Sequence, residues 1–332
     1  MRRRDFISLV GGTVATWPLP ARAQQTDGKQ RVSILLPYAE DDAEVQTWMA
    51  TFVQAFRELG WIDGSNVQID THRTTPDVGR INQAAIEVID RKPNVILAPG
   101  PLAVASLKQL TSTIPIVFLS VADPVGSGFV ASLAQPGGNI TGFTLGEFTM
   151  SGKMPEILKK IAPHVARITV IYSPQQGVPQ VGRLAAVQTA AATLGLQVSA
   201  ASAVSTEEIK HAIEKLDGES DRGVIVMPSP ATITNRNLII ALLARYRLPA
   251  VYETPVFARD GGLVAYGNDR VVLFRQAATY VDRILRGEKP ADLPVQAPVK
   301  YVLTINLKTA KALGLTVPQT LLVAADKVIE EH

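Results

Sequence analysis

Residues 95–119, VILAPGPLAVASLKQLTSTIPIVFL, contain the pattern that decides the fold. Two short runs, 95–98 and 116–119, are apolar throughout, and the segment 102–110 between them has the length and composition of a short helix. Strands without a polar face are typical of parallel sheets that helices cover on both sides. This stretch therefore predicts a strand–helix–strand unit with parallel strands.

The same alternation of strand and helix runs through the chain in two series. Each series has the make-up of a doubly wound, Rossmann-like α/β lobe. A further C-terminal part, residues 263–315, exceeds what one lobe needs, so we expect it to cross back between the lobes. Beyond the opening unit, the predicted strands are 32–36, 67–70, 168–172, 197–200, 224–227 and 250–252, and the predicted helices are 43–59, 77–91, 181–194, 205–216, 235–246 and 270–286.

The N-terminal residues 1–23 are typical of a cleaved export signal. Arg2-Arg3-Arg4 precedes a short apolar run, and Ala21-Arg22-Ala23 forms a small-x-small cleavage site. The run is too short to span a bilayer, which needs about 20 apolar residues. The order Arg3-Arg4-x-Phe6-Ile7 resembles a twin-arginine motif, and general secretion stays open as the alternative route. We therefore expect an exported protein whose mature chain does not insert into the membrane.

Composition excludes several classes of function. Removing residues 1–23 leaves 29 basic and 29 acidic residues, so the mature chain has no net charge that would favour nucleic acid. The chain has no cysteine, hence no disulfide framework and no lipidated anchor. Its four histidines are scattered and lack ligand spacing for a metal. We expect no metal and no nucleic-acid partner.

Candidate ligand contacts follow from one rule of parallel sheets. Ligands bind beyond the carboxyl ends of the strands, where helix N-termini offer free N–H groups. A tyrosine there can stack on a planar ligand, and a carboxylate can hold an ammonium group. Each of these residues also has a structural alternative, such as rim packing for the tyrosine, a turn or a helix cap for the short polar residues, or solvation for a glutamate. The candidates are Tyr38, Gly100, Ser120, Asp123, Ser229, Thr232, Glu253 and Asp269, with Asp123, Glu253 and Asp269 as possible partners of an ammonium group.

Signatures of catalysis are missing from the sequence. It contains no Gly-x-x-x-x-Gly-Lys-Ser/Thr phosphate loop and no Gly-x-Ser-x-Gly nucleophile elbow. Gly126-Ser127-Gly128 lacks the remaining glycine of a dinucleotide fingerprint. We therefore predict a binding protein that is not an enzyme and carries no cofactor.

Several longer stretches together are typical of one family. They are 114–118 (IPIVF), 122–130 (ADPVGSGFV), 133–142 (LAQPGGNITG), 261–267 (GGLVAYG) and 305–315 (INLKTAKALGL). With them, essentially all of the chain after the export signal resembles the ABC-transporter substrate-binding protein family that includes tryptophan- and tyrosine-type binders.

The resemblance implies a type I periplasmic-binding-protein fold, in which a three-crossover hinge joins two lobes that close on a small ligand. We expect an N-terminal lobe of residues 31–143 plus about 267–290, and a C-terminal lobe of 144–266 plus about 291–332. Family ligand positions correspond loosely to Tyr38, Gly100, Asp123, Ser229 and Asp269.

The implied function is that of a periplasmic, monomeric binding protein. It would capture a small organic ligand, with an amino acid or aromatic compound among the candidates, and deliver it to an ABC permease. Two alternatives stay open at this point. One is a sensor module that presents its ligand to a membrane receptor, and the other is an exported enzyme on the same fold.

Overall fold

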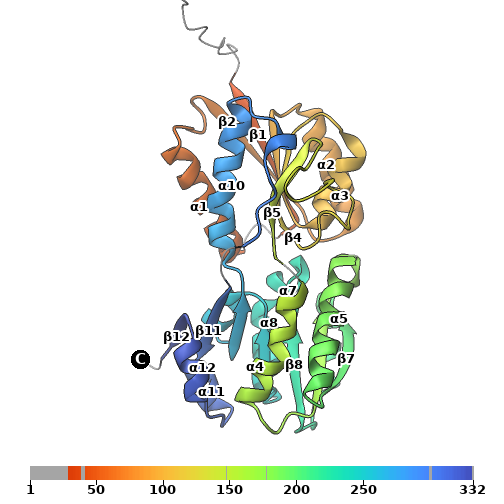
Figure 1. Cartoon of the computed structure of the whole chain (residues 1–332), viewed down its shortest axis with the longest axis vertical. Coiled ribbons are helices and arrows are strands. Elements are labelled where there is room, and N and C mark those ends of the chain that lie inside the picture. Colours follow the sequence, from red (N-terminus) through yellow and green to blue (C-terminus); the bar gives the residue numbers. More distant parts are fainter. Residues whose placement is uncertain (1–28, 39–41, 147, 177, 299–300, 331–332) are drawn as a thin grey trace, which may run out of the picture.

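The computed structural model describes residues 29–38, 42–146, 148–176, 178–298 and 301–330. They form two α/β lobes, one above the other along the longest axis of the molecule (Figure 1). Each lobe is built around its own sheet. The predicted export signal, residues 1–23, lies outside the described residues.

The first lobe contains a five-stranded sheet in the order β2-β1-β3-β4-β5, and all neighbouring strands are parallel. Alternate residues of β1 and β3 point to opposite faces, so one core forms with α1 and another with α2 and α3. The lobe is therefore doubly wound, as predicted. Its elements are β1 (Gln30–Leu36), α1 (Ala43–Glu58), β2 (Val67–Arg73), α2 (Val78–Asp90), β3 (Val95–Pro99), α3 (Pro101–Leu110), β4 (Ile116–Val121) and β5 (Ile140–Thr144).

A helix from late in the sequence completes this lobe. In Figure 1, α10 (Arg270–Leu285) is blue, yet it stands beside α1 among the elements drawn in warm colours. The Trp48 ring of α1 stacks on Phe274 of α10 with 5.6 Å between the ring centroids. The Trp61 indole also donates a hydrogen bond of 2.8 Å to Asp282. The chain thus returns to the first lobe after it has built most of the second.

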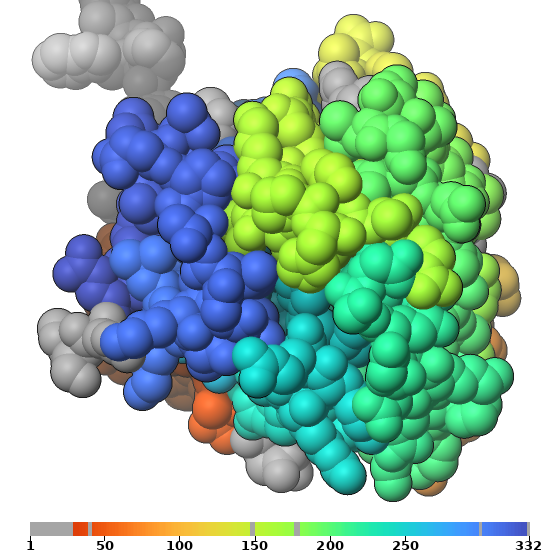
Figure 2. All heavy atoms as spheres, turned by 90° about the horizontal axis from the view of Figure 1, so that it is seen from below, coloured from red at the N-terminus to blue at the C-terminus, as the bar shows by residue number. Residues whose placement is uncertain are grey.

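The second lobe contains a seven-stranded sheet in the order β12-β11-β10-β9-β8-β6-β7. Its neighbours are parallel except for the antiparallel pair β10–β11. Seen from below, the blue C-terminal segment lies beside the yellow-green region of α4 (Figure 2). The strands are β6 (Arg167–Tyr172), β7 (Gln197–Ser202), β8 (Arg222–Val226), β9 (Ala250–Tyr252), β10 (Val264–Gly267), β11 (Val302–Asn306) and β12 (Lys327–Ile329). The α-helices are α4 (Lys153–Ile161), α5 (Val178–Thr193), α6 (Thr206–Glu214), α7 (Pro230–Thr234), α8 (Arg236–Arg245), α9 (Pro255–Arg259), α11 (Leu307–Ala312) and α12 (Gln319–Ala324), and the short 3₁₀ helices are η1 (Phe148–Gly152) and η2 (Pro174–Gln176). A third 3₁₀ helix, η3 (Pro290–Asp292), follows α10 and packs against β5 of the first lobe.

Three passages of the chain connect the two sheets. The first follows β5, and the second lies between β10 and α10. The third follows Gln296, whose backbone N–H still donates to Gly142 of β5 at 2.9 Å, and it leads into β11. This arrangement confirms the predicted fold of two doubly wound lobes joined by three crossovers.

One segment differs from its sequence-based interpretation. The glycine- and proline-rich composition of residues 135–142 predicts a turn-rich crossover between the lobes, but Ile140–Thr144 is the fifth strand of the first sheet. Gly142 gives the physical reason, because a Cβ added there would lie 2.1 Å from the carbonyl oxygen of Phe118. This glycine allows a close approach of β5 to β4 and does not mark a turn.

Candidate ligand-binding site

The carboxyl ends of the central strands of both sheets meet at a small cavity between the lobes. The space open to the centre of a water molecule is about 30 Å³. Each lobe contributes to the walls, and α10 contributes at its first residue. The lining residues are Tyr38, Gly100, Pro101, Ser120, Ala122 and Leu145 from the first lobe, Gln180, Arg183, Pro228, Ser229 and Pro230 from the second, and Arg270.

Four of the residues predicted from the sequence come together here, namely Tyr38, Gly100, Ser120 and Ser229. Each lies at the carboxyl end of its strand, where the chain turns into the next segment. Gly100 has a φ of 89° and precedes α3, a conformation that favours glycine. Ser120 has a φ of 59°, which is uncommon for a residue with a side chain and is often found at functional sites.

Three other predicted residues do not line this cavity. The Asp123 carboxylate accepts a hydrogen bond of 2.8 Å from the Gly126 N–H and so shapes a turn. Asp269 is the N-cap of α10. Thr232 is fully buried and forms a capping box with Ser229 at the start of α7. All three side chains accept hydrogen bonds from backbone N–H groups. Their roles as ligand contacts remain predictions from the sequence.

The eighth predicted residue, Glu253, lies behind the cavity wall and pairs with a basic residue there. Its carboxylate forms an ion pair with Arg183 of α5 and also accepts a hydrogen bond of 3.2 Å from Ser151. The Arg183 side chain is only 2% exposed. Burial, together with the nearby positive charge of Arg270, lowers the pKa of Arg183 to about 10. The guanidinium therefore keeps its charge at neutral pH.

Arg270 is the second cation of the cavity, and aromatic groups surround it. Its Nη1 donates a hydrogen bond of 2.8 Å to the Tyr38 hydroxyl. The guanidinium carbon lies 5.0 Å from the centre of the Trp48 ring, a cation–π contact. Arg270 is buried, and no carboxylate of the described residues forms an ion pair with it.

The Gln180 side chain adds a polar group that is only half satisfied. Its Nε2 donates to the Pro228 carbonyl at 2.8 Å, whereas its buried Oε1 has no hydrogen-bond partner among the described residues. A buried acceptor without a partner is costly unless a ligand or water supplies the donor. The cavity thus presents two guanidinium groups, several hydroxyls and one free acceptor, a set suited to holding a polar solute. The described residues contain no group of three or more acidic, histidine or cysteine side chains that could hold a metal ion.

Sequence reasoning missed Gln180, Arg183 and Arg270. The strand-end rule could have found Arg270, because it follows β10 by three positions. Gln180 and Arg183 lie inside the long helix α5 and carry no such signal.

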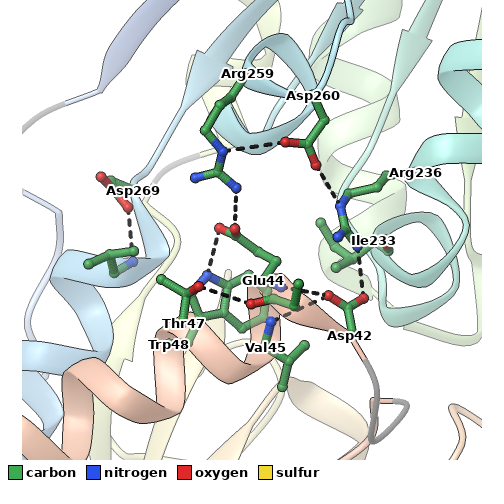
Figure 3. Close-up of polar contacts among 12 residues, drawn as sticks. Asp42, Glu44, Val45, Thr47, Trp48, Ile233, Arg236, Arg259, Asp260 and Asp269 are labelled. Atoms are coloured by element: carbon green, nitrogen blue, oxygen red, sulfur yellow. Dashed lines mark hydrogen bonds and ion pairs between the residues drawn. The ribbon is translucent and has the colours of Figure 1, made fainter.

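A cluster of charged side chains joins the two lobes (Figure 3). Asp42, the N-cap of α1, accepts a hydrogen bond of 2.9 Å from Arg236 of α8. Arg236 also lies 2.9 Å from Asp260. Arg259 of α9 contacts Glu44 of α1 and lies 3.4 Å from Asp260. The pairs of Asp42 with Arg236 and of Glu44 with Arg259 therefore connect the first lobe to the second.

Comparisons with known proteins identify the family and agree with the two-lobed fold. The model of the ABC transporter substrate binding protein family matches residues 36–329. The chain is also 25% identical over 293 residues to a tyrosine-binding protein of Clostridioides difficile (strain R20291), covering 88% of this chain and 84% of that protein.

Two solved structures share the fold over nearly the whole chain. A conserved domain protein from Vibrio cholerae has a TM-score of 0.83 at 24% identity, covering 91% of this chain and 100% of that one. An ABC domain in complex with L-Trp from Streptococcus pneumonia has a TM-score of 0.83 at 22% identity with the same coverage. The residues that the structure describes contain no helix long and apolar enough to span a membrane. On the family match, this chain belongs to the ABC transporter substrate-binding protein family.

Proposed function

We propose that this chain captures a small organic solute between its lobes and delivers it to the transmembrane permease of an ABC importer. The cavity carries this proposal, because both lobes line it at the carboxyl ends of their strands. This is the place where open α/β sheets bind ligands. Family membership supplies the transporter context.

Binding requires the lobes to part and close again. Only about 30 Å³ of the cavity is open to the centre of a water molecule, which leaves room for water but not for an organic molecule, so the ligand has to enter while the lobes are apart. The three crossovers are the natural hinge, and a hydrogen bond of 2.6 Å from Asn268 to the Leu145 carbonyl ties two of them together. Two solved structures support a closed arrangement of this chain. Its TM-score to the complex with L-Trp is 0.83. Its TM-score to the ligand-free, open structure of a substrate binding protein with adhesive properties from Clostridium difficile is only 0.64.

Among the sequence-predicted residues, we propose Tyr38, Gly100, Ser120 and Ser229 as direct ligand contacts. Glu253 acts through Arg183. Asp123, Thr232 and Asp269 act through the strand-end backbone that they hold. The named relatives, one that binds tyrosine and one solved with L-Trp, put amino acids and aromatic compounds first in a ligand screen.

The proposal includes a location outside the cytoplasmic membrane. Residues 1–23 would direct export and be removed, leaving a monomeric periplasmic protein with the lobe boundaries predicted above. Mass spectrometry of the protein from the periplasmic fraction tests this directly. A mature chain that still begins at Met1 would contradict it.

A thermal-shift screen tests the binding function. The panel holds amino acids, aromatic acids, short-chain carboxylates, nucleosides and sugars. A ligand at 100 times its Kd should stabilise the protein by about 2.7 kcal/mol, which is a shift of a few degrees for a chain of this size. The bound compound should be recovered chemically unchanged, as expected of a carrier without catalytic activity.

Two matched variants locate the binding site. Ala122→Phe fills the cavity and should abolish the shift, whereas Ala192→Phe, at an exposed position of α5, should leave it intact. Equal shifts in both variants would place the ligand elsewhere and refute the proposal.

A further inference from the structure

We infer that the ligand is a small carboxylic acid without an ammonium group, and that Arg270 receives its carboxylate. This inference rests on the proposed function, because it concerns the same cavity. It departs from the amino-acid ligands that the relatives suggest, and it follows from the charges of this chain's own residues.

The balance of charge in the cavity is the first argument. The described lining residues include two cations, Arg183 and Arg270. The carboxylate of Glu253 compensates Arg183. Arg270 is buried without a carboxylate partner among the described residues, and a guanidinium keeps its charge in proteins. Burying a charge without a counter-charge is costly, so the closed form favours a ligand that brings an anion.

The setting of Arg270 is the second argument. The Tyr38 hydroxyl and the Trp48 ring fix one edge and one face of the guanidinium. The remaining N–H donors of its planar fork suit the two oxygens of a carboxylate. The ten-residue helix α3 also begins at the cavity wall through Gly100 and Pro101, and its N-terminus adds a partial positive charge.

An ammonium group, in contrast, finds no free carboxylate among the described residues that line the cavity. One oxygen of Glu253 faces Arg183 and the other accepts from Ser151. Asp123 and Asp269 cap backbone N–H groups and do not line the cavity. The free acceptor is the uncharged Gln180 Oε1, which suits a hydroxyl donor. Among carboxylic acids, one that also carries a hydroxyl group, such as a 2-hydroxy acid, offers a partner to both Arg270 and Gln180.

Pairs of ligands that differ only at the 2-position give the sharpest test. Lactate is compared with alanine, 2-hydroxyisocaproate with leucine, and 3-phenyllactate with phenylalanine, by calorimetry on the mature protein. In at least one pair the hydroxy acid should bind ten times more tightly than the amino acid. The methyl ester of that hydroxy acid, which lacks the negative charge, should not bind detectably.

Substitutions then assign the carboxylate contact. Arg270→Gln should weaken binding of the hydroxy acid at least a hundredfold, and Arg270→Lys should restore part of it. Arg275→Gln is the matched control, since Arg275 lies on the same helix and pairs with Glu58 at an exposed site. The ligand pairs test the inference in the unmodified protein even if an arginine variant fails to fold.

The outcomes separate this inference from the proposed function. Tighter binding of the amino acids, or equal binding within every pair, would overturn the inference and leave solute binding in place. Binding of uncharged sugars or nucleosides alone would do the same. If no compound of the full panel stabilises the protein, the proposed function and the inference both fail.

Discussion

Replacing Arg236 with glutamine should shift the two lobes toward an open arrangement. The Arg236 guanidinium lies 2.9 Å from Asp42 in the first lobe and 2.9 Å from Asp260 in its own lobe (Figure 3). Only the contact with Asp42 crosses between the lobes. The substitution therefore removes an attraction that exists in the closed form and is absent from the open one.

The burial of the pair sets the size of the effect. The side chains of Arg236 and Asp42 are only 9% and 3% exposed in the closed form. Hydrogen bonds between charged groups at such sites contribute about 1.5–3 kcal/mol. Since about 1.4 kcal/mol corresponds to a tenfold change in an equilibrium constant, the ratio of closed to open molecules should fall about 10- to 150-fold. The second contact across the lobes, Glu44 with Arg259, remains and limits the loss.

Single-molecule energy transfer can measure this ratio. The chain has no cysteine, so Thr113→Cys in the first lobe and Gln188→Cys in the second provide two specific labelling sites at exposed positions. Arg245→Gln is the matched control, because Arg245 lies on the same helix as Arg236 but faces solvent and stacks on Tyr246. The control should have the closed fraction of the parent protein. Equal closed fractions in the Arg236 and Arg245 variants would refute the role assigned to this pair.

Three further predictions concern the scaffold. Trp48→Ala should lower the free energy of unfolding by about 3–5 kcal/mol in urea titrations, because Trp48 is fully buried between Tyr38 and Phe274. Gly267→Ala should lower the free energy of unfolding far more than Gly138→Ala in the same assay. A Cβ at 267 would lie 1.8 Å from the Glu253 carbonyl oxygen, whereas one at 138 meets nothing within 4 Å. Similar decreases in the two variants would contradict the close packing of β10. Burial, with the charge of Arg91, lowers the pKa of His72 from its ordinary value of 6.5. As the pH falls below 6.5, the unfolded chain therefore binds more protons at this site than the folded chain, and the free energy of unfolding should decrease. The decrease should be smaller in His72→Gln. An NMR titration midpoint for His72 at or above 6.5 would rule this out.

Most of the fold could be predicted because its signals are local. An apolar run such as 95–98 needs only its own residues to indicate a buried parallel strand, and the structure has β3 at Val95–Pro99. Strand β5 was not predicted, because the need for glycine at position 142 arises from a close contact with the backbone of Phe118, a residue more than twenty positions earlier in the chain. Only the paired sheet reveals that this glycine permits a close contact.

The position of the candidate site followed from topology. Tyr38, Gly100, Ser120 and Ser229 line one cavity because the carboxyl ends of parallel strands meet at one edge of each sheet. The rule depends on the order of the elements and not on side-chain detail. It therefore locates a cavity well but says little about the cavity's charge.

The charge of the cavity depends on long side chains that reach it from outside the strand ends. The sequence pattern points to carboxylates at those ends, but Asp123 and Asp269 have short side chains, and their carboxylates accept hydrogen bonds from nearby backbone N–H groups. Arginine has the opposite property, since its long stem lets Arg183 of α5 bring a guanidinium to the cavity from within a helix. Short polar residues at strand ends thus shape a site of this kind, and longer residues from the surrounding helices decide which charge it accepts. The buried guanidinium of Arg270 thus favours an anionic ligand here, even though the acidic residues are the more visible ones in the sequence.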